Sequence, residues 1–430
     1  MTIQEIIDKK RKKEELTTEE IAFFVNGYTK GEIKDYEAAA LLMAIAINSM
    51  STRETTDLTL AMAKSGEIVD LSKIEGIKAD KHSTGGVSDT TTIAAVPILA
   101  SLGIKMAKMS GRALGFTGGT IDKLEAIPNF NVNIEEKDFI NSVNKVGACI
   151  IAQSKNIAPA DKKLYALRDV TATVQSIPLI ASSIMSKKIA SGADIILLDV
   201  KYGNGAFMKT VSDAKKLAKT MIDIGKGLNK KMIAIITSME QPLGFGIGCN
   251  MEIEDAVNVL KGAKNNLATV TKEICAQILM AGKNLTYKQA TSQIEEVISN
   301  GKALVKLEEI VKNQGGDASV LKDFSLFKKA KYKEEIKSPK SGYITKIKSE
   351  ELGEIVREIG GGRLELGQEI MHEVGIFMNA SLGQKVDKNT TLCTLYSNKK
   401  FKGLTERIVN CFIISAKRAK VPALISAVLK

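Results

Sequence analysis

The chain has 430 residues, a length that allows two to four domains with hydrophobic cores of their own. Its 44% hydrophobic and 26% charged residues are typical of a globular protein and exclude a disordered or fibrous one. The net charge of +12 is most simply a lysine-rich surface facing water, and a preference for anionic ligands is the alternative.

Cysteine and histidine usage limits the kinds of site that the chain can build. The five cysteines form no CxxC pair, which argues for a reducing compartment and against a disulfide framework or a zinc site. With only two histidines, His82 and His372, a histidine-rich metal centre is excluded by count. The N-terminus is too polar for a signal peptide, and the longest apolar run, 38–47, is too short to span a bilayer. We therefore expect a cytoplasmic protein that does not enter a membrane.

Helices are predicted for residues 1–66, followed by an alternation of strands and helices. Three capping boxes mark helix starts: Thr2 with Glu5, Thr17 with Glu20, and Ser51 with Glu54. The β-type runs 105–109, 195–201 and 232–237 alternate with helical patterns, which indicates an α/β domain with a largely parallel sheet.

The segment 161–192 interrupts this alternation and is helical again. Pro178 lies near a helix start and Gly192 lies just past a helix end. We expect this segment to return to the N-terminal helices. The chain would then cross between two lobes near 65–71, 157–163 and 192–194, which makes these crossings candidate hinges.

The composition changes again near residue 330. Residues 331–345 are charged and contain Pro339, which is typical of a linker. Short strand-like runs follow at 342–348, 375–378 and 391–396. The predicted fold is α/β in class: a helical lobe plus a large α/β lobe with a mostly parallel sheet, and a C-terminal α+β domain. The boundaries are 1–66 and 161–192 for the helical lobe, 67–160 and 193–330 for the α/β lobe, 331–345 for the linker and 346–430 for the last domain.

The segment 81–92 carries the clearest chemical signal. Two glycines let backbone amides approach an anion, and the helix expected from Ile93 adds partial positive charge at its start. A Gly-Gly pair alone is usually an ordinary turn, but Lys81, Ser83 and Thr92 around it favour phosphate binding. His82 lies in the same loop. A lone histidine is more often structural, and contact with substrate is the alternative.

A second polar glycine segment, with Lys108, Ser110 and Thr120, follows a predicted strand, where α/β folds place their ligands. The two loops are expected to converge on one anion, and two unrelated turns are the alternative. Ser183 and Lys187 stand four residues apart on a predicted helix and therefore share one face. Such a pair is usually solvated, but across a cleft from the loops it would, together with Arg168, bind a second substrate.

Long blocks of this sequence resemble the pyrimidine-nucleoside phosphorylases, the family that includes thymidine phosphorylase. The most specific block is 110–125, SGRALGFTGGTIDKLE, and the blocks 81–92, 158–173 and 177–188 are also similar to the family. The resemblance implies reversible phosphorolysis of pyrimidine nucleosides in nucleoside salvage. Inorganic phosphate would be the co-substrate, no organic cofactor would be needed, and the protein would be a homodimer that binds no nucleic acid.

The resemblance also implies roles for individual residues. Phosphate contacts are implied for Lys81, Ser83, Thr92, Lys108, Ser110 and Thr120. Nucleoside contacts are implied for Arg168, Ser183, Lys187, Leu114 and Phe116, with His82, Arg168 and Lys187 as the catalytic residues. A potassium or other monovalent cation site is implied at Ser88, Thr90, Leu243, Gly246 and Asp255.

Three positions depart from the family pattern. Phe116 stands where the family usually has His, Ser88 where it usually has Gly, and Asp255 where it usually has Glu. The first departure affects the pocket for sugar and base, and the other two affect the cation site.

The implied mechanism is a displacement at C1′ of the sugar by phosphate, with inversion and an oxocarbenium-like transition state. Arg168 and Lys187 would stabilise charge on the departing base, and His82 would donate to its O2. One alternative is a phosphoribosyltransferase of the anthranilate type, for which Asp122 and Glu125 are the obvious metal ligands near the second loop. A basic nucleic-acid-binding protein is a remote alternative, and the absence of Trp speaks against it.

Overall fold

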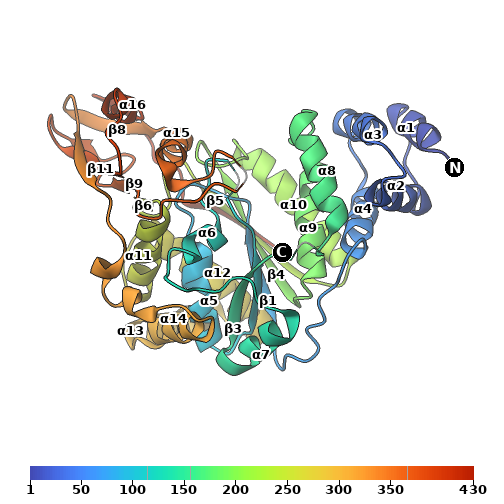
Figure 1. Cartoon of the computed structure of the whole chain (residues 1–430), viewed down its shortest axis with the longest axis horizontal. Helices are drawn as coiled ribbons and strands as arrows, with labels where there is room; N and C mark the ends of the chain where they lie inside the picture. Colours follow the sequence, from blue (N-terminus) through green and yellow to red (C-terminus); the bar gives the residue numbers. More distant parts are fainter. Residues whose placement is uncertain (114, 155, 366) are drawn as a thin grey trace.

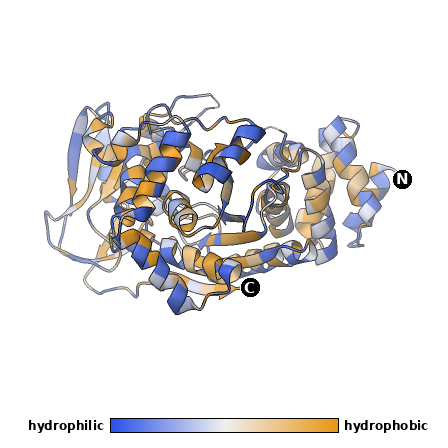
Figure 2. Cartoon of the chain, turned by 90° about the horizontal axis from the view of Figure 1, so that it is seen from below, coloured by the Kyte–Doolittle hydropathy of each residue, from blue (hydrophilic) through white to orange (hydrophobic). Residues whose placement is uncertain are grey.

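The computed structural model describes residues 1–113, 115–154, 156–365 and 367–430. The N-terminal helices lie at one end, the α/β lobe in the middle and the C-terminal domain at the other end (Figure 1). Figure 2 shows the apolar residues gathered on the central strands and on the inner faces of the helices. Among the described residues, no helix combines the length and the apolar character needed to cross a bilayer.

Six helices build the helical lobe: α1 (Ile3–Arg11), α2 (Thr18–Lys30), α3 (Asp35–Asn48), α4 (Thr52–Lys64), α8 (Pro159–Val170) and α9 (Ile177–Ala190). The three predicted capping boxes are present at the starts of α1, α2 and α4. Leu164 of α8 and Leu179 of α9 join the same apolar core as Phe24 and Leu41. The segment expected to return to the N-terminal helices therefore packs against them.

A four-stranded sheet forms the centre of the α/β lobe, in the order β1 (Ala79–Ser83), β4 (Ile195–Tyr202), β5 (Lys231–Ser238) and β13 (Ile425–Leu429). The first three strands are parallel, and β13 runs antiparallel to β5. A second parallel pair, β2 (Met106–Ser110) and β3 (Ala148–Ala152), is joined to the sheet by a bridge between Lys78 and Lys105. The predicted strands at 105–109, 195–201 and 232–237 are confirmed with shifts of one residue at their ends.

Helices cover both faces of this sheet, which explains its long apolar strands. Ile195 and Leu197 of β4 belong to one core, and Ile196 and Leu198 belong to the other. The helices of the first core are α5 (Thr91–Ser101), α11 (Cys249–Leu260), α12 (Asn266–Lys283), α13 (Tyr287–Ser299) and α14 (Lys302–Asn313). The second core includes α7 (Glu136–Val146), α9 and α10 (Val211–Gly227), so α9 contacts both the helical lobe and the sheet.

The C-terminal domain contains two small antiparallel sheets, after the short 3₁₀ helices Ala318–Leu321 and Phe324–Leu326. One sheet consists of β10 (Lys385–Val386), β8 (Gly342–Ile347) and β12 (Phe412–Ser415). The other consists of β6 (Gly246–Ile247), β9 (Gly375–Met378), β11 (Thr391–Ser397) and β7 (Tyr332–Lys337). Its helices are α15 (Ser349–Val356), which continues into a π turn at Arg357–Gly361, and α16 (Leu404–Val409). Strand β6 comes from the α/β lobe and thereby ties the two parts together.

Two predicted segments differ from the structure. The expected linker 331–345 contains β7 and the beginning of β8. The charged residues of this segment were the reason for predicting a linker. They belong instead to β7, an edge strand in which only Ile336 is buried and the charged side chains face water. The last residues, expected in the C-terminal domain, return to the α/β lobe, where β13 pairs with β5 and Leu429 packs against its core. The other domain boundaries stay predictions.

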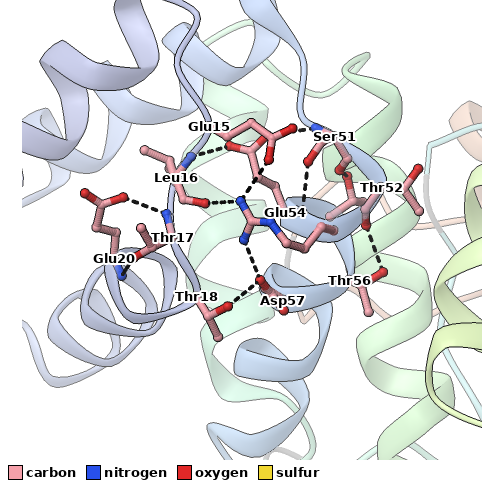
Figure 3. A network of polar contacts seen from close by, with 12 residues as sticks. Glu15, Leu16, Thr17, Thr18, Glu20, Ser51, Thr52, Glu54, Thr56 and Asp57 are labelled. Carbon is pink, nitrogen blue, oxygen red and sulfur yellow. Dashed lines mark hydrogen bonds and ion pairs between the residues drawn. The ribbon is translucent and has the colours of Figure 1, made fainter.

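Glu54 connects α1, α4 and the turn between α1 and α2 through one buried carboxylate. It accepts hydrogen bonds from Lys10 Nζ at 2.9 and 3.1 Å, from the Leu16 amide at 2.9 Å and from the Ser51 amide at 2.7 Å. Figure 3 shows Glu54 between Leu16 and Ser51, within a network that extends to Asp57 and Glu20. Since Lys10 and Glu54 are both buried, neither charge has water as an alternative partner.

We predict that Glu54→Ala lowers the free energy of unfolding by about 3 kcal/mol, because it leaves the Lys10 ammonium buried without its carboxylate. Denaturant unfolding followed by circular dichroism measures this change. The matched control is Glu15→Ala, which removes an exposed partner of Arg53 and should leave the free energy of unfolding nearly unchanged. Equal losses in the two variants would contradict the importance of the buried pair.

Candidate active site

The first glycine loop follows β1 directly and is held together by Asp89. Lys81 is buried, and its ammonium donates to Thr91 Oγ1 at 2.6 Å and to Thr92 Oγ1 at 3.5 Å. Ser83 donates to the Asp89 carboxylate at 2.5 Å, and the Thr91 hydroxyl donates to the same carboxylate at 2.6 Å. The predicted cluster of a lysine and hydroxyls around a turn is therefore present.

A second buried lysine, Lys201, supports this loop from the neighbouring strand β4. Its ammonium lies 2.7 Å from Asp199 and 3.7 Å from Asp89, while Lys81 lies 3.5 Å from Asp199. Burial alone would raise the pKa of Asp89, but the ammonium groups of Lys201 and Lys81 lower it well below its usual range. Sequence analysis missed Asp89, Asp199 and Lys201. Two charges in the otherwise apolar strand β4 were the available signal, because a charge inside a sheet needs a partner.

The second glycine loop, between β2 and α6 (Thr120–Leu124), contacts the first one. Lys123 Nζ donates to the Asp89 carbonyl at 2.9 Å. Gly85 has a φ of +95°, a conformation that favours glycine, and a Cβ added there would lie 3.6 Å from Thr117 Oγ1. The two loops therefore contact each other, and their convergence on one anion stays a prediction.

The predicted phosphate residues of the second segment lie on either side of this loop, on β2 and at the start of α6. Lys108 and Ser110 on β2 are buried, and Thr120 is half-buried at the first turn of α6. Lys108 Nζ donates to the Met109 carbonyl at 2.8 Å and lies 3.0 Å from the Asp80 carboxylate.

The two acidic residues near the second loop are engaged with arginines. Arg112 lies 3.0 Å from Asp122 and donates to Glu125 at 2.5 and 2.8 Å. Asp122 also accepts from Arg363 at 2.6 Å and from the Ala113 amide at 2.7 Å. Because cations already pair with both carboxylates, the arrangement does not resemble a pair of acidic ligands prepared for a metal–diphosphate complex. It disfavours the phosphoribosyltransferase alternative.

Helix α9 presents Ser183 and Lys187 on one face, as predicted. Lys187 Nζ donates to Ser183 Oγ at 3.1 Å and forms an ion pair with Asp161 of α8. The adjacent Lys188 is buried and lies 2.7 Å from the carboxylate of Asp80 on β1. Helix α9 therefore reaches the strand that leads into the first glycine loop.

Arg168 is buried and bonded within the helical lobe. Its guanidinium donates to the carbonyls of Leu179 at 3.0 Å, Val174 at 2.8 Å and Thr173 at 3.4 Å. These bonds fix the turn between α8 and α9. Arg168 on α8 therefore belongs to the same lobe as Ser183 and Lys187 on α9. Its described hydrogen bonds all go to the backbone of that lobe.

His82 lies on β1 between Lys81 and Ser83, and its side chain is half-buried. Its burial, together with the nearby ammonium groups of Lys188, Lys108 and Lys187, lowers its pKa well below the ordinary histidine value. The imidazole is therefore neutral at neutral pH, and one ring nitrogen is a hydrogen-bond donor.

Phe116 forms an aromatic pair with Phe207 at a centroid distance of 5.4 Å, next to the first glycine loop. Its backbone packs against Gly353 of α15, and its ring borders the core of the C-terminal domain. Leu114, the other residue predicted beside the nucleoside, lies outside the described residues.

The five predicted cation ligands lie around one turn. Leu243 and Gly244 donate their amides to the carbonyls of Val87 and Ser88, both at 3.2 Å. Asp255 accepts from the amides of Phe245 and Gly246, both at 2.7 Å. A Cβ at Gly244 would collide with Asp255 and lie 2.7 Å from Ser88 Oγ, so these two side chains meet over this glycine.

Observations on Ser88, Thr90 and Asp255 test whether these residues fit a cation. Ser88 has a φ of +58°, and its hydroxyl is buried and has no hydrogen-bond partner among the described residues. Thr90 is directed to Glu252, to which it donates at 3.0 Å. Burial raises the pKa of Asp255 to about 6, although the amides of Gly246 and Phe245 act in the opposite direction. An unpaired buried hydroxyl beside a buried carboxylate fits a hard monovalent cation.

Comparisons with known proteins cover the whole chain. Residues 4–66 match the helical bundle domain of a glycosyl transferase family, residues 75–304 match the α/β domain of that family, and residues 343–415 match the pyrimidine nucleoside phosphorylase C-terminal domain. The chain is 50% identical to the pyrimidine-nucleoside phosphorylase of Bacillus subtilis over an alignment of 433 positions that covers 100% of both chains. It is 47% identical to the enzymes of the same name from Staphylococcus aureus, over all of both chains, and from Geobacillus stearothermophilus, over 99% of each.

A solved structure shows the same fold at low identity. Anthranilate phosphoribosyltransferase from Thermus thermophilus superposes with a TM-score of 0.57 at 19% identity, covering 72% of this chain and 99% of that one. The predicted fold class, with a helical lobe, a large α/β lobe and a C-terminal domain containing sheet, is confirmed.

Proposed function

The chain belongs to the pyrimidine-nucleoside phosphorylase family, and we propose that it cleaves pyrimidine nucleosides reversibly with inorganic phosphate. The products are the free base and the α-(deoxy)ribose 1-phosphate. One observation carries the assignment to this site: two glycine loops with buried lysines meet beside a helix that carries Ser183 and Lys187. This arrangement supports the proposal of an anion site and, next to it, a cationic site for a second substrate.

Phosphate binds on the α/β lobe in this proposal. Hydroxyl groups of both loops and two lysines supply the donors: Lys81, Ser83, Thr92, Lys108, Ser110 and Thr120. Ser83 donates to Asp89, so phosphate binding would exchange one anionic acceptor of this hydroxyl for another. No protein nucleophile is needed, because phosphate itself attacks C1′.

The pyrimidine binds on the helical lobe, against Arg168, Ser183 and Lys187, with Leu114 and Phe116 lining the nucleoside site. As the C1′–N1 bond breaks, its electron pair moves to the base, and negative charge develops on the ring nitrogen and the carbonyl oxygens. The Lys187 ammonium stabilises that charge, and neutral His82 donates a hydrogen bond to O2. Phosphate forms the new bond at C1′ from the opposite face, which inverts the anomeric carbon.

Closure of the lobes brings the two substrates together. The crossings lie side by side, since Glu67 donates to the Asn156 carbonyl at 2.9 Å and Val69 donates to the Ala190 carbonyl at 2.8 Å. Gly192 has a φ of +85° and packs against the Val69 carbonyl. A compact set of crossings permits rotation of one lobe against the other, which excludes water from the reacting atoms.

The function predicts that release of free base from uridine or thymidine requires phosphate. Lys187→Ala should lower kcat by at least about 100-fold, because it removes a cation that stabilises the leaving base. Phosphate binding, measured by calorimetry, should persist in this variant. Ultraviolet absorbance or chromatography follows the base. Phosphate-independent release would contradict the function, and equal loss of phosphate affinity in Lys187→Ala would contradict the division between lobes.

We further propose that a potassium or other monovalent cation binds at Ser88, Thr90, Leu243, Gly246 and Asp255. The unpaired Ser88 hydroxyl, its backbone carbonyl and the Asp255 carboxylate support this site. The cation would hold the first glycine loop against the segment that follows β5. It would supply structural support at a distance from the reacting bond.

The cation site predicts a pH-dependent stabilisation by potassium. Cation binding requires ionised Asp255, whose pKa is about 6, so binding is favoured above that pH and is lost as the carboxyl is protonated below it. Potassium chloride should raise Tm at pH 7.5 more than choline chloride does at equal ionic strength, and the difference should vanish at pH 5. In Asp255→Asn no difference should occur at either pH, and its persistence there would contradict the site.

We also propose a homodimer formed through α3. Tyr36, Ala40, Met43 and Ile47 are exposed and spaced so that they share one helix face, and Tyr36 and Ile47 are 73% and 74% exposed. A row of large apolar side chains on one exposed face is typical of a protein–protein interface. A second copy of the chain is the partner that the family suggests, and a two-fold axis would pair this face with itself.

The dimer predicts that the double variant Tyr36→Glu, Ile47→Glu sediments as a monomer in analytical ultracentrifugation, whereas the unmodified chain sediments as a dimer. The two glutamates of each copy would then face the glutamates of the other copy in the interface, and their like charges would repel. Leu326→Glu is the matched control, because this side chain is 55% exposed and lies outside the helical lobe. A dimer that survives the double variant would place the interface elsewhere.

A further inference from the structure

Asp80 joins the two lobes through a pair of buried lysines. Its carboxylate on β1 lies 3.0 Å from Lys108 of β2 and 2.7 Å from Lys188 of α9. Both ammonium groups also donate to the Met109 carbonyl, at 2.8 Å from Lys108 and at 3.4 Å from Lys188. All three charged side chains are buried, so water screens their interaction very little.

Among the described residues, Lys123 pairs with Glu252 at 2.6 Å, but the other buried charges around the glycine loops do not cancel. Lys81 and Lys201 lie among Asp89 and Asp199, two cations with two anions. In the other cluster, Lys108 and Lys188 share the single carboxylate of Asp80. The one positive charge in excess therefore belongs to the pair that Asp80 bridges. An incoming anion is the group that would balance it.

We propose that Lys188 is a positioning residue that acts through Asp80 on Lys108 and so makes phosphate affinity depend on the position of α9. The inference rests on the proposed function, since it takes Lys108 as a phosphate contact. Because α9 also carries Ser183 and Lys187, the same helix serves the pyrimidine. The Lys188–Asp80 contact then couples the two substrates.

The direction of the coupling follows from the charges that face Lys108. These are Asp80 and Lys81 on β1 and Lys188 on α9; His82, also on β1, is neutral. Burial and the Lys188 ammonium lower the pKa of Lys108 and Asp80 raises it, and the result is about 7. If Lys188 moves away with α9, Asp80 pairs with Lys108 alone and neutralises it. Phosphate binding then loses the excess charge, and by reciprocity bound phosphate favours the position of α9 in which Lys188 contacts Asp80.

The variant pair Lys188→Met and Lys188→Arg tests the role of the charge. Lys188→Met should raise the KM for phosphate by at least 10-fold at pH 7 while kcat falls less than threefold, and Lys188→Arg should restore most of the phosphate affinity. Thermal melts followed by circular dichroism verify that each variant is folded. Equal losses in the Met and Arg variants, or a loss in kcat alone, would overturn the proposal.

The pH dependence of anion binding gives a readout that a purely structural role would not move. Sulfate is the probe, because it keeps the same charge between pH 6 and 9, and calorimetry measures its affinity without turnover. In the unmodified chain this affinity should fall as pH rises through about 7, where Lys108 loses its proton. The midpoint should move to higher pH in Lys188→Met, which removes a like charge, and to lower pH in Asp80→Asn, which removes the opposite one. Midpoints that stay in place would overturn the proposal.

The two failures can be told apart. If the unmodified chain releases no base with phosphate, the proposed function fails, and the sulfate titrations still decide whether Lys188 controls the anion site. If phosphorolysis occurs and the sulfate midpoints do not move in either variant, only the coupling fails.

Discussion

The pairing of buried lysines with carboxylates is the interaction on which the rest of this molecule depends. The buried lysines around the glycine loops are Lys81, Lys108 and Lys201 of the α/β lobe and Lys188 of α9, each with an aspartate within 3.7 Å, and Lys123, which pairs with Glu252 at 2.6 Å. Unpaired, each would cost several kcal/mol of desolvation. Paired, they connect β1, β2, β4 and α9. The site thus keeps positive charge buried away from water without destabilising the sheet that carries it.

In the proposed function, this pairing accounts for the binding of the two substrates to different lobes. Cations gathered in a single pocket would repel one another, whereas here carboxylates on β1, β4 and α8 compensate the cations near them. Asp80 and Asp199 serve the anion side and Asp161 serves Lys187. The division separates two negative partners, the attacking phosphate and the departing base, until the lobes approach. Helix α9 contributes residues to the cores of both lobes, and its position therefore depends on both of them.

Local features of the molecule could be predicted from the sequence, and features that depend on distant residues could not. Capping boxes, parallel strands and the Ser183–Lys187 face follow from spacing, and the two glycine loops were recognised from their polar residues. Asp80 and Lys188 were missed, because they are 108 positions apart and only the packing of α9 next to β1 brings them together. The charges of β7 were taken for a linker because charge on an edge strand looks the same as charge in a loop. The cation ligands came from resemblance and not from pattern.

The return of β13 to the sheet has a kinetic consequence. The C-terminal domain is inserted between β5 and its last neighbour, so both of its ends are anchored in the α/β lobe. Contacts between residues so far apart in sequence form slowly, since a long loop must close first. We expect the edge of β5 to stay open during refolding until the inserted domain has collapsed. In that interval the bare edge is the part of the molecule most exposed to mispairing with another chain.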